Sequence, residues 1–110
     1  MIEWKTISSI DTIEEIKEKS HTTPCLIFKH STRCSISSIA KHRLDSNWNL
    51  QQISPYYLDL ITFRSISSAI SQEFGIDHES PQVLLIKNGI CIFDTSHLDI
   101  SVSHIAENIK

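Results

Sequence analysis

Residues 26–48 constrain the fold more than any other stretch, because an apolar strand pattern runs directly into an amphipathic helix pattern. Residues 26–28 are apolar, residues 29–33 form a polar loop, and a helix is predicted over 34–48. Its apolar positions recur about every four residues and are Ile36, Ala40, Leu44 and Trp48, with Ile39 beside them. We therefore expect one stripe of this helix to face a core.

Cys34 stands where this predicted helix begins. The first N–H groups of a helix have no intrahelical partner, and the helix dipole places positive charge at the same end. Both effects stabilise a thiolate, which is the nucleophilic form of cysteine. The junction is therefore typical of a segment that presents one reactive sulfur.

The composition indicates one globular domain over residues 1–110, with a hydrophobic fraction of 40% and a charged fraction of 21%. No run approaches the roughly 18 apolar residues of a membrane helix, so no membrane partner is expected. Residues 1–5 lack the basic and apolar regions of a secretory signal. The three cysteines are an odd number without a C-x-x-C pair, which favours a reducing cytoplasm over a disulfide framework.

The net charge of −3 hides an uneven distribution of charged residues. Between Lys19 and Leu44 there is no acidic residue, whereas four of the ten basic residues fall there. These four are Lys29, Arg33, Lys41 and Arg43. They form either a solvated helix face or an electropositive rim that favours the thiolate and attracts an anionic partner. Four charges with little aromatic interleaving are too few for a nucleic-acid surface, so no nucleic-acid partner is expected.

The rest of the chain alternates strand and helix patterns. Asp11, with Glu14 three residues later, predicts a capping box for a short helix. Gly75 ends a later helix, and Asn88-Gly89 is the strongest short signal for a hairpin. The expected elements are strand 1–7, helix 11–19, strand 24–28, helix 34–48, strand 55–61, helix 65–74, strands 83–86 and 90–93, and helix 102–109. This order predicts an α/β, thioredoxin-like fold, in which helices flank a central mixed β-sheet.

Four short segments carry a family resemblance. Residues 27–37 are IFKHSTRCSIS, residues 79–83 are ESPQV, residues 87–89 are KNG and residues 96–97 are SH. Together they resemble the YtxJ-type, monothiol bacilliredoxins, which are thioredoxin-like proteins of the bacillithiol system. The resemblance implies removal of bacillithiol from mixed disulfides on cytoplasmic proteins, with this or a similar small thiol as co-substrate and no tightly bound cofactor. It also implies that Cys34 is the nucleophile, that Pro81 is a cis-proline facing it, and that the Ser80 backbone pairs with the substrate.

Two positions depart from the commoner pattern of such proteins. Ser35 stands where many relatives have proline, so the turn after Cys34 loses a rigid φ angle. Phe28 lies six residues before Cys34, where ordinary thioredoxins carry a buried acid that helps to move protons. Proton transfer is therefore expected to use water, a histidine or the partner thiol.

Ser37 occupies the position of the second cysteine of a C-x-x-C enzyme. A hydroxyl cannot resolve a mixed disulfide, but it can donate a hydrogen bond to the Cys34 thiolate from one helical turn away. We therefore expect Ser37 to assist Cys34 in a monothiol exchange, in which an external thiol frees Cys34. Cys25 and Cys91 lie in apolar strand runs, where inert packing is expected in preference to a resolving role.

The expected substrate-binding residues are Arg33, Ser35, Ser80, Pro81, His97 and His30. Arg33 is the better anion clamp, because a guanidinium binds a carboxylate bidentately. His30 and His97 are either solvated loop residues or groups that contact the malyl carboxylates of bacillithiol or shuttle a proton. His30, Cys34 and His42 match no standard zinc spacing, so no metal site is expected.

Three functions are compatible with these residues. The expected one is a cytoplasmic monothiol thiol–disulfide oxidoreductase that acts on S-thiolated proteins and a small anionic thiol. The second is a non-catalytic thioredoxin-fold module in which Ser80-Pro81 docks a partner peptide. The third is a small-thiol or peroxide sensor that is modified at Cys34.

Overall fold

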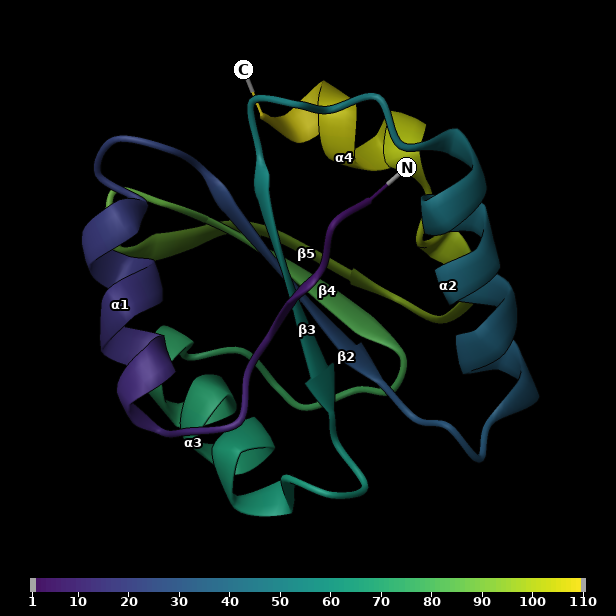
Figure 1. Cartoon of the computed structure of the whole chain (residues 1–110), viewed down its shortest axis with the longest axis horizontal. Coiled ribbons are helices and arrows are strands. Elements are labelled where there is room, and N and C mark those ends of the chain that lie inside the picture. Colours follow the sequence, from purple (N-terminus) through teal and green to yellow (C-terminus); the bar gives the residue numbers. More distant parts are fainter. Residues whose placement is uncertain (1, 110) are drawn as a thin grey trace.

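In the computed structural model, residues 2–109 form a five-stranded mixed sheet with helices on both faces (Figure 1). The elements are β1 (Lys5–Thr6), α1 (Asp11–Lys19), β2 (Cys25–His30), α2 (Ser35–Asn47), β3 (Ser54–Asp59), α3 (Arg64–Phe74), β4 (Gln82–Lys87), β5 (Ile90–Ser96), the 3-10 turn η1 (His97–Asp99) and α4 (Val102–Asn108). Met1 and Lys110, which the expected strand 1–7 and domain 1–110 include, lie outside the described residues. Within residues 2–109, no helix has the length and apolar character needed to cross a membrane.

The strands lie in the order β1-β3-β2-β4-β5 across the sheet. β3 runs parallel to both of its neighbours, β1 and β2, while β4 is antiparallel to β2 and β5 is antiparallel to β4. The order of elements and the mixed sheet that the sequence predicts are therefore confirmed.

β2 is the central strand of the sheet, and all six of its residues are buried. Successive side chains of a strand point to opposite faces. Leu26 and Phe28 pack into the core beneath α2 and α4, whereas Cys25 and Ile27 pack into the core beneath α1 and α3. Figure 1 shows these two helix pairs on opposite sides of the sheet.

The apolar stripe of α2 is shifted from the predicted one at its first turn. Ala40 and Leu44 are buried as expected, but the third buried residue of the helix is Ser37. Ile36 and Ile39 are 38% and 46% exposed, so their predicted core positions are wrong. The observed stripe follows the i, i+3, i+7 spacing, and a polar residue enters it because its hydroxyl finds partners inside the protein.

The predicted capping box at the start of α1 is wrong. Asp11 is the first helical residue, and the N-cap is Ile10, whose side chain offers no acceptor. The Oγ of Ser9 accepts a hydrogen bond from the backbone N–H of Asp11 instead, at 3.2 Å. A serine two positions earlier thus satisfies one of the free N–H groups of this helix.

The two predicted turn signals are confirmed. Gly75 caps α3 in the left-handed conformation, with φ of 65°. Asn88 and Gly89 both have positive φ, 55° and 78°, between the antiparallel strands β4 and β5. These dihedral angles are those of the hairpin turn that Asn-Gly favours.

Candidate active site

Cys34 is the N-cap residue of α2 and is partly exposed. Its backbone is extended, with φ of −114° and ψ of 122°. Its N–H donates to the Ser31 carbonyl at 3.2 Å, and its own carbonyl accepts from the Ser38 N–H at 3.1 Å. The loop from β2 is thus fastened on both sides of the residue, which holds the thiol at the start of the helix.

Pro81 reaches the same edge of the sheet as the Cys34 loop. Gln82, the first residue of β4, pairs with Lys29 near the carboxyl end of β2, so Pro81 lies beside that end. The Ser80–Pro81 peptide bond is cis, as the resemblance implies. The N–H of His97 donates to the Pro81 carbonyl at 3.0 Å, which brings the residues after β5 to this edge as well.

Ser37 is fully buried beneath this loop. Its Oγ accepts from the Ser31 N–H at 3.0 Å and lies 2.7 Å from Nδ1 of His30. Because the oxygen already accepts from Ser31, its hydroxyl proton is available to donate to Nδ1 of His30. The predicted hydrogen bond from Ser37 to Cys34 is absent among the described contacts, since His30 takes the hydroxyl.

His30, the last residue of β2, is buried rather than solvated. Its ring centroid lies 5.6 Å from those of both Phe28 and Tyr57. Burial, with a smaller contribution from the charge of Lys41, lowers the pKa of His30 below its ordinary value. The ring is therefore neutral at pH 7, and the solvated-loop interpretation of this residue is wrong.

We expect the free energy of unfolding to decrease as the pH falls from 7 to 5, in part because of His30. Its pKa is lower in the folded chain than the ordinary value of about 6.5, so the unfolded chain binds a proton first. Stability is therefore lost as the pH falls through that ordinary value. Urea unfolding at pH 7, 6 and 5 measures the loss, which we expect to be smaller in His30→Asn. An equal loss in both proteins would contradict this assignment.

The other predicted substrate-binding side chains lie around this edge and differ in whether a neighbouring residue already contacts them. Arg33 and Ser35 are exposed on either side of Cys34. His97 is also exposed, but its Nε2 lies 3.4 Å from a carboxylate oxygen of Glu79. Glu79 therefore competes with any anionic ligand for His97, whereas no ion pair involves Arg33 among residues 2–109.

A metal-binding arrangement is not found among residues 2–109. No group of three His, Cys, Asp or Glu side chains there is placed to hold a metal ion. Of His30, Cys34 and His42, the set considered from the sequence, His30 is already hydrogen-bonded through Nδ1 to Ser37.

Three exposed apolar side chains on α2 and η1 were not foreseen from the sequence. We call Ile36, Ile39 and Leu98 the apolar rim. Leu98 belongs to η1, and its side chain is 55% exposed. Its backbone carbonyl accepts a hydrogen bond from Arg43 of α2 at 3.0 Å. The rim therefore joins α2 to the segment that follows β5. A sequence signal was present, because Ile36 and Ile39 lie three residues apart on one helix face.

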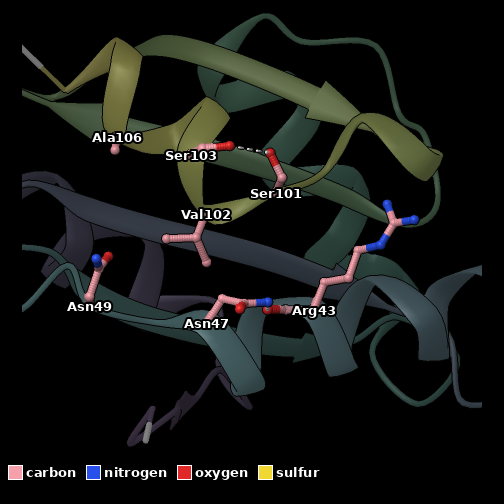
Figure 2. Close-up of a pocket in the computed structure, with 7 residues that line it drawn as sticks. All are labelled: Arg43, Asn47, Asn49, Ser101, Val102, Ser103 and Ala106. Atoms are coloured by element: carbon pink, nitrogen blue, oxygen red, sulfur yellow. Dashed lines mark hydrogen bonds between the residues drawn. The ribbon is translucent and has the colours of Figure 1, made fainter.

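One cavity of the described residues lies away from Cys34. It has a volume of about 610 Å³ and separates the second half of α2 from the start of α4 (Figure 2). Its lining residues are Arg43, Asn47, Asn49, Ser101, Val102, Ser103 and Ala106. A smaller pocket of about 200 Å³ lies closer to the site, and His30, Ser38, Lys41, His42 and Asp45 line it.

The sequence of this chain matches the family model of the monothiol bacilliredoxin BrxC over residues 5–105. The chain belongs to the monothiol bacilliredoxin family. A solved structure of a protein proposed to be an oxidoreductase with a thioredoxin fold is 30% identical, with 96% of this chain and 92% of that one covered and a TM-score of 0.85. Family and fold together support a thiol oxidoreductase.

Two solved thioredoxins share the fold at low sequence identity. The thioredoxin of Fasciola hepatica is 10% identical, with 96% of this chain and 95% of that one covered and a TM-score of 0.76. The thioredoxin of Malassezia sympodialis is 19% identical, with 96% and 86% covered and a TM-score of 0.71. The fold is therefore the thioredoxin fold, as the order of elements predicts.

Proposed function

We propose that this chain is a monothiol thiol–disulfide oxidoreductase that removes bacillithiol, or a similar small anionic thiol, from mixed disulfides on cytoplasmic proteins. One observation carries the proposal. Cys34 is partly exposed at the start of α2, and the buried residue one turn later is a serine, Ser37, in place of a second thiol. The family supports the same reaction.

Neither of the other cysteines is placed to resolve a disulfide at Cys34. Cys25 is the first residue of β2, five residues before the end from which the Cys34 loop emerges, a span of about 17 Å along a strand. Cys91 pairs with Ile86, which pairs with Cys25, so it lies at the same remote end. Burial raises the pKa of Cys25, and it raises that of Cys91 to about 11, so both remain unreactive thiols.

The exchange then proceeds in two steps. The Cys34 thiolate attacks the bacillithiol sulfur of the mixed disulfide, a new S–S bond forms, and the substrate sulfur leaves with the electron pair and takes a proton. A second small thiol, as its thiolate, then attacks the bacillithiol sulfur on Cys34. This step produces a disulfide of two small thiols and restores the Cys34 thiolate. The external thiol is required because Ser37 cannot perform the second attack.

The surface around Cys34 supports binding of both parts of such a substrate. The apolar rim offers exposed aliphatic surface to the polypeptide, and the backbone at Ser80–Pro81 lies at the same edge for an extended segment. Arg33, which is exposed and directly precedes Cys34 in the sequence, serves as the clamp for the carboxylates of the small thiol. His97 joins it when Glu79 releases the ring.

His30 and Ser37 are the groups that we assign to proton movement near Cys34. Phe28 fills the position where thioredoxins have an acid, and it is fully buried. The Oγ of Ser37, which is hydrogen-bonded to the neutral His30, also accepts from the Ser31 N–H. The Ser31 carbonyl in turn accepts from the Cys34 N–H. This pair supplies a neutral acid–base couple in place of the missing carboxyl group.

The test is mass spectrometry of the protein after incubation with a bacillithiolated substrate protein. We expect a mass gain of one bacillithiol, mapped to the peptide that carries Cys34, which persists until a free small thiol is added. Cys25→Ala and Cys91→Ala are matched controls that should gain the same adduct. Cys34→Ala should neither gain it nor release the substrate, and transfer that persists in this variant would contradict the proposal.

The same experiment, together with a peroxide treatment, separates the two rival functions. A non-catalytic module would bind the substrate protein without any transfer of bacillithiol. A sensor would accumulate sulfenic acid at Cys34 when treated with peroxide, without repeated turnover of a mixed disulfide. Either outcome would contradict the proposed oxidoreductase function and support the rival instead.

A further inference from the structure

Lys29 is a buried cation that the thiol chemistry does not use. It lies on β2 next to His30 in sequence, so it faces the opposite side of the sheet, toward α3, and it is 0% exposed. Its Nζ donates to the Ser67 carbonyl at 3.0 Å and to Ser71 Oγ at 2.9 Å, and it lies 3.3 Å from Nδ1 of His78. All three partners are neutral acceptors, so no carboxylate in contact balances this charge among residues 2–109.

A buried ammonium group with neutral partners is unfavourable, because the charge has lost its hydration without gaining a counterion. Burial lowers the pKa of Lys29 to about 8, which leaves the amine mostly protonated at pH 7. The folded chain therefore holds a positive charge beneath α3 that an anion nearby would stabilise.

A cavity of about 150 Å³ lies next to this amine. Its lining residues are Leu60, Arg64, Ser67, Ser68 and His78. Arg64 is the first residue of α3, is exposed, and has no ion pair among the described residues. His78 connects the cavity to the buried amine, because its Nδ1 lies 3.3 Å from both Lys29 Nζ and Ser67 Oγ.

The polar groups of this cavity are mainly hydrogen-bond donors. Since Lys29 donates to Nδ1 of His78, the neutral ring carries its proton on Nε2. The Arg64 guanidinium and the Ser68 hydroxyl add further donors. Of the acids closest in sequence, Glu79 lies 3.4 Å from His97 and Asp59 accepts from the backbone that follows it, whereas Asp77, which precedes His78, is exposed.

We propose that the cavity between the start of α3 and the loop before Pro81 binds a small dianionic oxyanion of the phosphate or sulfate type. Arg64, Ser68 and His78 contact the oxyanion, and Lys29 balances its charge from behind His78. Two full positive charges, on Lys29 and Arg64, match two negative charges on the ligand. The volume holds an inorganic oxyanion and is below the roughly 300–1,000 Å³ of pockets for larger ligands.

An oxyanion bound in this cavity would also contact the segment that leads to the edge of the sheet where Cys34 and Pro81 lie. His78 belongs to the segment that leads to Ser80–Pro81, and Gln82 fastens this segment by donating to the Asp77 carbonyl at 2.9 Å. The oxyanion site itself lies on the face of the sheet opposite to α2. It therefore requires no part of the proposed thiol exchange, and it is testable in the absence of any thiol substrate.

The test is an NMR titration of the whole chain at pH 7 with inorganic phosphate, sulfate and acetate, at constant ionic strength maintained with sodium chloride. We expect saturable shifts of the Ser67, Ser68 and His78 amides with phosphate and sulfate, and at least tenfold weaker binding of acetate. Arg64→Gln should raise the dissociation constant for phosphate about tenfold or more. Lys29→Met should also raise the dissociation constant for phosphate.

Arg43→Gln is the matched control, because it removes an exposed arginine from α2 on the opposite face. It should leave the dissociation constant for phosphate unchanged. Shifts that do not saturate, or an equal loss of affinity in Arg43→Gln and Arg64→Gln, would overturn the proposal in favour of general charge screening. Acetate binding as tight as that of phosphate would overturn the assignment to a dianion. Arg64 is exposed, so its variant remains informative if Lys29→Met does not fold.

Discussion

Replacing Phe28 with alanine is expected to lower the free energy of unfolding by about 3–5 kcal/mol. Phe28 is fully buried on the central strand. Its ring centroid lies 5.5 Å from that of Trp4, 5.6 Å from that of His30 and 6.4 Å from that of Tyr57. Removal of the ring leaves a cavity that a strand held by neighbours on both sides cannot collapse to fill.

Such a loss is large beside the roughly 5–15 kcal/mol that stabilises a whole domain. Urea unfolding of the reduced protein at pH 7 measures it. Phe28→Leu is the control, since it retains much of the apolar volume and should lose markedly less stability than Phe28→Ala. If Phe28→Ala loses less than about 1 kcal/mol, the aromatic cluster does not support the central strand as described.

The order of strands and helices could be predicted because its signals are local. The apolar run at 26–28 and the Asn88-Gly89 turn each identify their element without knowledge of the rest of the chain. The buried face of α2 could not be predicted to the residue. Spacing alone allowed either Ile36 or Ser37 to face the sheet at the first turn, and the choice depends on how the helix lies against β2.

The candidate site was predictable in its outline and not in its hydrogen bonds. Cys34 follows from the strand-to-helix junction, whereas its proximity to Pro81 was implied only by the family resemblance and agrees with the antiparallel pairing of β2 and β4. The pairing of Ser37 with His30 was missed, because the strand end was predicted at residue 28 and His30 was thus assigned to a loop. The residues that bind Lys29 lie 38 to 49 positions away in sequence, beyond any local pattern.

The last two residues of β2 point to opposite faces of the sheet, and each contributes to one of the two proposed sites. His30 faces α2 and bonds Ser37 beneath the Cys34 loop, whereas Lys29 faces α3 and bonds His78 before Pro81. Both contacts fix segments that meet at the carboxyl end of this strand. A polar pair at the end of an otherwise apolar strand therefore positions the two loops between which the redox chemistry is proposed to occur.

Replacing Ser37 with cysteine is expected to convert the proposed monothiol exchange into a dithiol exchange. The new thiol lies three residues after Cys34 in the first turn of α2, which is the spacing of C-x-x-C enzymes. It would attack the Cys34 sulfur of the Cys34–bacillithiol disulfide, form an intramolecular disulfide and release the small thiol. The adduct that persists in the wild type should therefore disappear without any external thiol.

The substitution has a structural cost, because a thiol is a weaker partner than a hydroxyl for the Ser31 N–H and His30 Nδ1. We expect Ser37→Cys to lower the free energy of unfolding by about 1–3 kcal/mol. Intact mass measurements after mixing with the bacillithiolated substrate follow the adduct over time. Ser46→Cys, which adds an exposed thiol in the last turn of α2, is the control and should keep the adduct. If Ser37→Cys retains the adduct as long as the wild type does, residue 37 does not determine the monothiol character of this chain.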